Sequence, residues 1–354
     1  RLSPQERDLL LSPQRPIVLL EKKTAAGFPE EIAPGQNSIG IMLAYTPLHL
    51  LLLEPEKDYP ELLVMTSGNL SEEPIAYQDD DANRRLNQLA DAFLTHNRPI
   101  HMRVDDSVAR IVDGSPYIIR RARGYAPDPL VLTEKMPSIL ATGAELKNTF
   151  CLTKDHYAFI SHHIGDLENQ ETLKSYEEGI EHYRRLFKIT PDIIACDLHP
   201  DYLATQYAHH QISNHPQLKL ITIQHHHAHL AACLADNRWS KDEPVIGLTF
   251  DGTGLGTDGN IWGGEVLLGN TRGFERLYHL KYTPLPGGNL AIHKPARMAL
   301  SYLETSNIEW DPNLPPVAFL CADERTVIRT QMKHHINAPL TSSMGRLFDA
   351  VSAL

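Results

Sequence analysis

The sequence has few cysteines, and they form no metal-binding or disulfide pattern. The four cysteines are scattered, without a CxxC pair: Cys151, Cys196, Cys233 and Cys321. Zinc fingers and disulfide-stapled folds need closely spaced or paired cysteines. We therefore expect neither a zinc finger nor a disulfide-stapled fold, and the cysteine usage fits a reducing cytoplasm.

An excess of positive charge and a long apolar run are also missing. There are 33 lysines and arginines against 44 aspartates and glutamates, so the net charge is −11 with histidine neutral. This balance argues against a general nucleic-acid-binding protein. No apolar run reaches the length of a membrane span, and no signal-peptide pattern occurs. We expect no nucleic-acid partner, no membrane partner and a cytoplasmic location.

The chain is long enough for more than one domain, since 354 residues allow two or three domains with sizeable cores. In the first part, periodicity predicts strands at 16–20, 62–66, 103–112 and 117–120 and a helix at 81–94. Two prolines and a polar stretch then mark a boundary near 133–137. We predict an α/β protein with domains at 1–135 and 136–354.

The second part shows one pattern twice. A strand, a polar turn and a strand occupy 139–152, followed by a strand at 158–161 and a helix that begins near 171. An apolar strand, a glycine-rich turn at 251–259 and a strand return within 244–268. Two such turns facing one another would hold the phosphates of a nucleotide, as in actin-like and sugar-kinase-like ATPases. Two unrelated α/β units would give a similar pattern.

Four histidines lie within six residues, and two of them are spaced to bind one ion. His225 and His229 are four residues apart, so on a helix they share a face. Asp251 follows an apolar strand-like run and can add a carboxylate. Neutral imidazoles and a carboxylate are ligands for a divalent metal, and the residues are compatible with zinc, iron or magnesium. A structural histidine cluster is the alternative.

The glycines that follow Asp251 suggest an anion site beside the metal. Gly252 and Gly254 have no side chain, so backbone amides there can approach an anion closely.

Two polar regions in the first part suit an anion. Ser67 and Asn69 follow a predicted buried strand, where hydroxyl and amide groups can bind a phosphate or an acyl group. A turn or a helix cap is the alternative. Arginines gather at 98–123, and the planar fork of each suits phosphate. A solvated strand edge is the alternative there.

Both ends of the sequence look cut. The chain begins with Arg1 rather than Met and stops at Leu354, inside an apolar helical pattern. We therefore expect it to be a segment of a longer protein.

Longer motifs follow one another along the chain: MLAYTPLH at 42–49, TSGNLSEEPI at 66–75, RVDDSV at 103–108, RRARGYAP at 120–127, GAELKNTF at 143–150, HIGDLEN at 163–169, DLHPDY at 197–202 and SSMGRLFDA at 342–350. With the histidine run and the Asp251 loop, they resemble the HypF family of hydrogenase maturation carbamoyltransferases. The resemblance covers essentially the whole chain, and so many motifs in this order are specific.

The resemblance implies a fold that is incomplete at both ends. Residues 1–135 would be the later part of a YrdC-like α+β domain. Residues 136–354 would be the earlier part of an actin-like, sugar-kinase-like duplicated α/β domain, similar to the tRNA threonylcarbamoyl transferases. The family's acylphosphatase-like and zinc-finger regions, the basic residues that begin the YrdC-like site and a late metal-binding aspartate are absent from this sequence.

The resemblance also implies an enzyme that transfers a carbamoyl group. It would start from carbamoyl phosphate and ATP, proceed through a carbamoyl-adenylate and end on the C-terminal cysteine of the partner HypE. That thiocarboxamide would become a cyanide ligand of a nickel–iron hydrogenase. The implied cofactors are ATP and a divalent metal (Mg, Zn or Fe).

Site residues follow from the matching motifs. Those that would hold the adenylate are Ser67, Asn69, Arg103 and Arg121. Those that would hold the metal are His225, His229 and Asp251. Lys147 and Asp251 are the catalytic candidates, and the remaining nucleotide contacts would come from Asn148, Gly252, Gly254, Gly345 and Asp349.

One departure and three rival functions remain. Asn289 stands where the family would have an aspartate. A small-molecule O-carbamoyltransferase uses the same two modules in the opposite order. A tRNA-modifying enzyme would need a basic surface. A nucleotide- or metal-binding fragment without turnover belongs to a different class.

Overall fold

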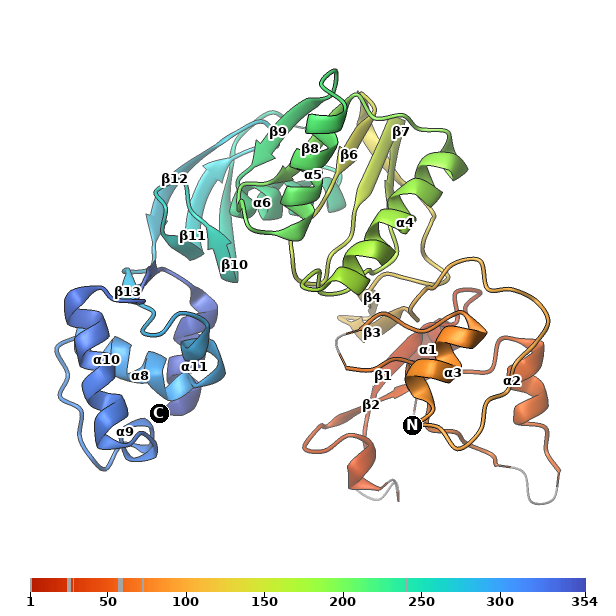
Figure 1. Ribbon diagram of the computed structural model, residues 1–354, viewed down its shortest axis with the longest axis horizontal. Helices are drawn as coiled ribbons and strands as arrows, with labels where there is room; N and C mark the ends of the chain where they lie inside the picture. Colours follow the sequence, from red (N-terminus) through yellow and green to blue (C-terminus); the bar gives the residue numbers. More distant parts are fainter. Residues whose placement is uncertain (1, 24–26, 28, 57–59, 72, 240) are drawn as a thin grey trace. The chain divides into compact units, whose positions relative to one another are not determined.

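A computed structural model describes the chain except for residues 1, 24–26, 28, 57–59, 72 and 240, and its described part contains three sheets (Figure 1). The mixed α/β class predicted from the sequence is confirmed. Contacts divide the chain into two compact units, residues 1–195 with 202–220 and residues 196–201 with 221–354. The domain boundary at 135/136 stays a prediction.

The first unit opens with a four-stranded sheet in the order β2-β1-β3-β4. Its strands are β1 (Ile17–Glu21), β2 (Ser38–Ile41), β3 (Val108–Val112) and β4 (Ser115–Arg120). Helix α1 (Pro4–Leu11) begins at a Ser3 cap and packs Leu9 and Leu10 on this sheet. Asp113 and Gly114 both have positive φ and join β3 to β4, so the predicted strand pair is confirmed with a shorter first strand. Short helical segments also occur here, namely η1 (Glu30–Ile32) and α2 (Pro47–Leu52).

One sequence prediction in this region is wrong, and another is right only in part. No strand forms at 62–66, where Leu62 is 71% and Val64 is 77% exposed. Helix α3 (Asp79–Leu86) is shorter than the predicted helix at 81–94, and Leu94 is exposed. Apolar periodicity produces a stable helix or strand only where another surface covers its apolar face. The side chains of 62–66 and the apolar side chains between residues 87 and 94 are exposed.

The second sheet has the order β5-β7-β6-β8-β9, and it belongs to the first unit except for the last residues of β8 and β9, which contacts assign to the second unit. Its strands are β5 (Leu130–Met136), β6 (Ile139–Ala141), β7 (Cys151–Ile160), β8 (Ile193–Asp197) and β9 (Lys219–Ile223). Residues 158–160 of the strand predicted at 158–161 are confirmed as strand, but they continue β7 and do not form a separate strand. The helix predicted from 171 is confirmed as α4 (Gln170–Phe187), whose buried Tyr176 and Tyr183 contact the ring of Phe150. Helix α5 (Leu203–Asn214) joins β8 to β9 (Figure 1).

The second unit has a sheet in the order β10-β11-β14-β13, with β12 paired to β11. Its strands are β10 (Val245–Leu255), β11 (Ile261–Gly269), β12 (Phe274–His279), β13 (Thr283–Pro284) and β14 (Leu340–Thr341). The predicted hairpin at 244–268 is confirmed as β10 and β11. The turn is shorter than predicted, because β10 continues to Leu255 past a register shift between Phe250 and Gly254. Helix α6 (His225–Asp236) packs on this sheet through Leu230 and Leu234.

Helices complete the second unit. They are α7 (Asn289–His293), α8 (Pro295–Thr305), α9 (Pro315–Phe319), α10 (Ala322–His334) and α11 (Met344–Ala353). Leu300 of α8 and Ile328 of α10 are fully buried in one cluster. Met298 of α8 packs with Ala350 of α11 in another. Among the described residues, no helix combines the length and the apolar character that crossing a bilayer requires.

Candidate metal and phosphate site

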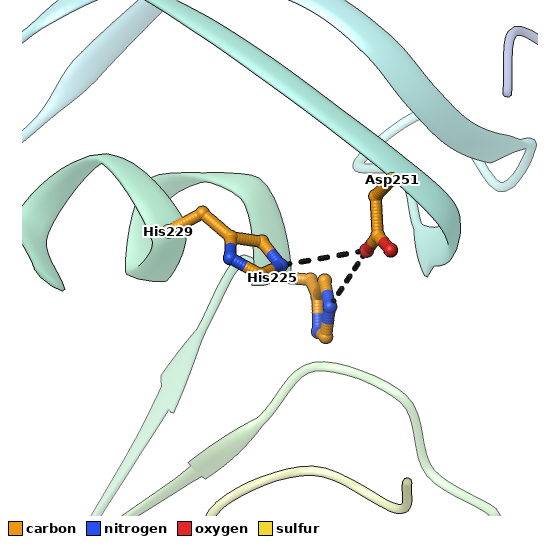
Figure 2. A group of neighbouring side chains, drawn as sticks. All are labelled: His225, His229 and Asp251. Atoms are coloured by element: carbon orange, nitrogen blue, oxygen red, sulfur yellow. Dashed lines mark ion pairs between the residues drawn. The ribbon is translucent and has the colours of Figure 1, made fainter. Parts of the chain in front are cut away.

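Helix α6 and strand β10 bring three possible metal ligands together within the second unit (Figure 2). Oδ2 of Asp251 lies 3.0 Å from Nε2 of His225 and 3.4 Å from Nε2 of His229. The ligand atoms of the three residues lie within 4.8 Å of one another. Ligand bonds of about 2 Å place neighbouring donor atoms roughly 3 Å apart. The spacing therefore fits three ligands of a single ion.

The beginning of α6 is fixed by its cap and by the adjacent strand. The side chain of Gln224 accepts the N–H of His227 at 2.9 Å and donates to the carbonyl of Leu255 in β10 at 3.2 Å. Leu230 of α6 lies directly on Gly247 of β10, where an added Cβ would come within 2.7 Å of Leu230 Cδ1. These contacts hold the histidine-bearing turn against the strand that carries Asp251.

Gly254 is a second point of close approach, and replacing it with alanine tests the packing of the site. Its Cβ would lie 2.6 Å from Cε1 of His226 and 3.0 Å from Cδ2 of His225. We expect Gly254→Ala to lower the stability by about 1–3 kcal/mol through overpacking, and to weaken metal binding by displacing His225. The matched control is Gly252→Ala, whose Cβ would meet only Nη2 of Arg346, at 4.0 Å. Thermal melting and metal titration of both variants check this, and equal behaviour would contradict it.

The charges on the three residues favour the binding of a cation between them. Burial lowers the pKa of His225, but Asp197 and Asp251 raise it more, to about 9. Burial raises the pKa of Asp251, whereas His225, His229 and the N–H of Gly252 together hold it well below its ordinary value. Oδ2 of Asp251 is buried, and it lies at ion-pair distance from both imidazoles without a well-aligned hydrogen bond to either. A divalent metal would satisfy this oxygen, and the two imidazoles suit zinc or iron(II) better than magnesium.

Asp197 also belongs to this site, although sequence analysis assigned it no role. It ends β8, and its Oδ2 lies 2.7 Å from Nδ1 of His225, the ring nitrogen opposite the one that faces Asp251. The available signal was its place directly after the apolar strand 193–196, because carboxyl ends of strands often carry functional side chains in α/β folds.

The predicted nucleotide residues Gly252 and Gly345 lie next to each other. A Cβ on Gly345 would come within 3.0 Å of the Cα of Gly252. Ser343 caps α11 and donates to the carbonyl of Gly252 at 2.8 Å. Asp349, another predicted nucleotide contact, pairs with Arg346 at 2.6 Å. Arg346, which sequence reasoning missed, places its guanidinium beside Gly252, whereas Gly254 faces the imidazoles instead.

A buried carboxylate is connected by hydrogen bonds to the segment that carries Asp251. Glu265 of β11 is fully buried and accepts from Nε of Arg276 at 2.6 Å and from Oγ of Ser342 at 2.5 Å. The adjacent Ser343 donates to the backbone carbonyl of Asp251 at 2.9 Å. Glu265 is thus connected to the metal-ligand segment through two consecutive serines.

Lys147 and Asn148 lie in the first unit, on the connection between β6 and β7. Lys147 has a positive φ of 50°, and its backbone N–H donates to Asp166 at 2.7 Å. The side chain of Asn148 is buried, and its amide donates to the carbonyls of Thr142 and Ala144. Its side-chain NH₂ therefore stabilises the connection, and the proposed phosphate contacts of both residues stay predictions.

The structure gives the four predicted adenylate residues different surroundings. Ser67 is exposed, Asn69 donates to the carbonyl of Leu70, and Arg103 stacks on the ring of Tyr77. Arg121 donates to three backbone carbonyls, those of Ile160, Tyr125 and Asp128. Within the described part of the chain, no hydrogen bond or ion pair joins any two of the four. Their shared role stays a prediction.

Family models match nearly the whole chain. Residues 134–236 match the HypF Kae1-like domain, and residues 247–354 match the second subdomain of a carbamoyltransferase Kae1-like domain. Residues 2–122 match the Sua5/YciO/YrdC family, described as telomere recombination.

Individual relatives agree with these models. The chain is 42% identical over 99% of its length to carbamoyltransferase HypF of Rhizobium leguminosarum bv. viciae, covering 45% of that protein. It is 38% identical over 99% of its length to the probable carbamoyltransferase HypF of Methanocaldococcus jannaschii, again covering 45%. The chain thus spans less than half the length of these relatives.

Two solved structures have the same fold. Full-length HypF in a phosphate- and nucleotide-bound form superposes with a TM-score of 0.90 at 49% identity, over 100% of this chain and 45% of that chain. HypF of T. kodakarensis gives a TM-score of 0.85 at 36% identity, over 99% of this chain and 47% of that chain. The chain therefore belongs to the HypF family of carbamoyltransferases.

Proposed function

We propose that the second unit carries the transfer site of an ATP-dependent carbamoyltransferase. The observation that carries the proposal is the convergence of His225, His229 and Asp251 beside the contact between Gly252 and Gly345. The carbamoyl group would come from carbamoyl phosphate, pass through a carbamoyl-adenylate made from ATP, and reach the C-terminal cysteine of HypE. The nucleotide-bound relative supports the nucleotide part of this proposal. The four free cysteines fit a cytoplasmic location.

His225, His229 and Asp251 would hold a divalent metal, which when bound supplies a Lewis acid for the charge on the phosphate. The open side of Gly252 and the guanidinium of Arg346 beside it would bind that phosphate. The acceptor thiol loses its proton to solvent and attacks the carbamoyl carbon. A carbon–sulfur bond forms, the bond to the phosphate oxygen breaks, and AMP leaves with its electrons. This step needs no nucleophile from the chain itself.

The adenylate-forming step is proposed for the first unit. Ser67, Asn69, Arg103 and Arg121 would contribute there as the family motifs imply. Lys147 and Asn148 would contact phosphates at the connection between β6 and β7. The contacts of Arg121 and Asn148 with backbone carbonyls show that both residues also stabilise local structure.

Two assays separate the steps. The first follows exchange of pyrophosphate into ATP that depends on carbamoyl phosphate, in this chain and in the full-length Rhizobium relative. The second gives this chain synthetic carbamoyl-adenylate and a peptide ending in cysteine, and measures AMP and thiocarbamate. We expect metal-dependent transfer by the chain, and its loss in the His225→Ala, His229→Ala double variant.

The outcomes distinguish the rival functions. Exchange by the relative alone, with no transfer by this chain, would identify the chain as a nucleotide- and metal-binding fragment without turnover. Transfer to a hydroxyl acceptor in preference to the thiol would favour a small-molecule O-carbamoyltransferase. Absence of exchange and transfer in both proteins, with any metal, would overturn the carbamoyl-adenylate route.

A further inference from the structure

The two ring nitrogens of His225 face two different carboxylates. Nε2 faces Asp251 at 3.0 Å, and Nδ1 faces Asp197 at 2.7 Å. We infer that Asp197 is a positioning residue that accepts the Nδ1–H of His225 and thereby presents Nε2 to the metal. This inference rests on the metal site proposed above and deepens it.

Asp197 is itself held firmly in place. Its side chain is only 6% exposed, and its Oδ1 accepts the backbone N–H of His199 at 2.8 Å. The next residue, Leu198, donates its N–H to the carbonyl of Ile223 at 3.0 Å, two residues before His225. The end of β8 and the beginning of α6 are therefore tied together by backbone as well as by the pair of side chains.

The contact between Asp197 and Nδ1 of His225 affects metal binding because of the chemistry of imidazole. A neutral imidazole has one N–H and one lone pair, so the nitrogen that donates determines the nitrogen that binds metal. A carboxylate on Nδ1–H holds the proton there, fixes the ring orientation and increases the basicity of Nε2. An ion pair that only stabilised a protonated His225 would instead compete with the metal, so loss of Asp197 would then not weaken metal binding.

The two histidines differ in how well they are held. The side chain of His225 is 17% exposed and that of His229 is 53% exposed. Among the described residues, the ion pairs of His225 involve both Asp197 and Asp251, whereas that of His229 involves Asp251. His225 is therefore the anchoring ligand, and Asp197 acts on the better-fixed side of the site.

The test measures metal affinity of the whole 354-residue chain. Zn²⁺ is titrated in competition with a chromophoric chelator, and Co²⁺ is followed by its visible absorption. We expect Asp197→Asn to weaken both affinities by about 10- to 100-fold, the usual effect of losing such a partner. The matched control is Asp236→Asn, an exposed carboxylate at the end of the same helix. Affinities of the two variants within twofold of each other would overturn the inference.

A second measurement needs no variant and so does not depend on the folding of Asp197→Asn. Ring ¹⁵N shifts of His225 in the wild-type chain with Zn²⁺ should show Nδ1 protonated and Nε2 bound. Binding through Nδ1, or no binding of Zn²⁺ or Co²⁺ at all, would refute the role of Asp197. Because neither measurement involves turnover, failure of carbamoyl transfer with these metal results intact would count against the proposed function alone.

Discussion

Replacing Asp251 with alanine is expected to lower divalent-metal affinity by at least about 100-fold. A site of this kind binds its ion with roughly 10 kcal/mol, so each of three protein ligands accounts for about 3 kcal/mol, and each 1.4 kcal/mol is about a factor of ten. Asp251 is the ligand shared by both imidazole contacts, at 3.0 and 3.4 Å. Its removal also leaves His225 and His229 without the anion between them. Carbamoyl transfer from the adenylate should fall with metal occupancy.

The control for Asp251→Ala is a histidine from the same run. His227 turns away from the three ligands, and its Nε2 contacts the carbonyl of Asn270 at 2.8 Å. His227→Ala should therefore retain metal affinity within a few-fold of wild type, even if it melts somewhat earlier. Competition titration with Zn²⁺ compares the variants directly. Loss of affinity in His227→Ala as large as in Asp251→Ala would mean that the histidine run binds metal without the geometry described above.

Replacing Glu265 with alanine is expected to destabilise the second unit severely. Removing one partner of a buried ion pair costs about 3–5 kcal/mol, and the lower end of this range is expected here because Arg276 keeps its ion pair with Asp258 at 3.1 Å. Arg276 would lose its closest carboxylate, and Ser342 and the N–H groups of Gly263 and Gly264 would lose an acceptor. For a unit of this size, such a loss lowers the melting temperature by about 10 °C.

The matched control for Glu265→Ala lies next to Arg276 in sequence. Glu275 is an exposed residue of β12, so Glu275→Ala changes the same charge without uncovering a buried one. We expect its melting temperature to stay within about 2 °C of wild type, as for most surface changes. Calorimetry of both variants checks the difference. If Glu265→Ala melts at the same temperature as Glu275→Ala, the Glu265–Arg276 ion pair contributes little to stability.

The sequence predicted those parts of the site that depend on local spacing. His225 and His229 are four residues apart on one helix, and Asp251 follows an apolar strand, so both patterns are visible in the printed sequence. Asp197 and Arg346 were missed because their roles depend on contacts with segments 28 and about 90 residues away. Contacts between distant segments produce no periodic pattern in the sequence.

The same reasoning explains which elements of the fold were predicted. Helix α4 was expected because its buried face repeats at helical spacing, and Tyr176, Ile180 and Tyr183 are indeed buried. The segment 62–66 has an equally apolar sequence, yet its side chains are exposed and no strand forms. Apolar character shows that a segment can be covered, whereas only the tertiary structure shows whether it is covered.

The division of the chain has a practical consequence for dissecting the protein. The polypeptide passes between the two compact units three times, after residues 195, 201 and 220. A continuous gene fragment encoding 221–354 would keep His225, His229 and Asp251 but would lack Asp197, which reaches the second unit through a short excursion of the chain. Such a fragment would present an intact set of ligands around an imidazole with no partner for its other nitrogen. Cloning boundaries for a minimal transfer module therefore have to begin upstream of β8.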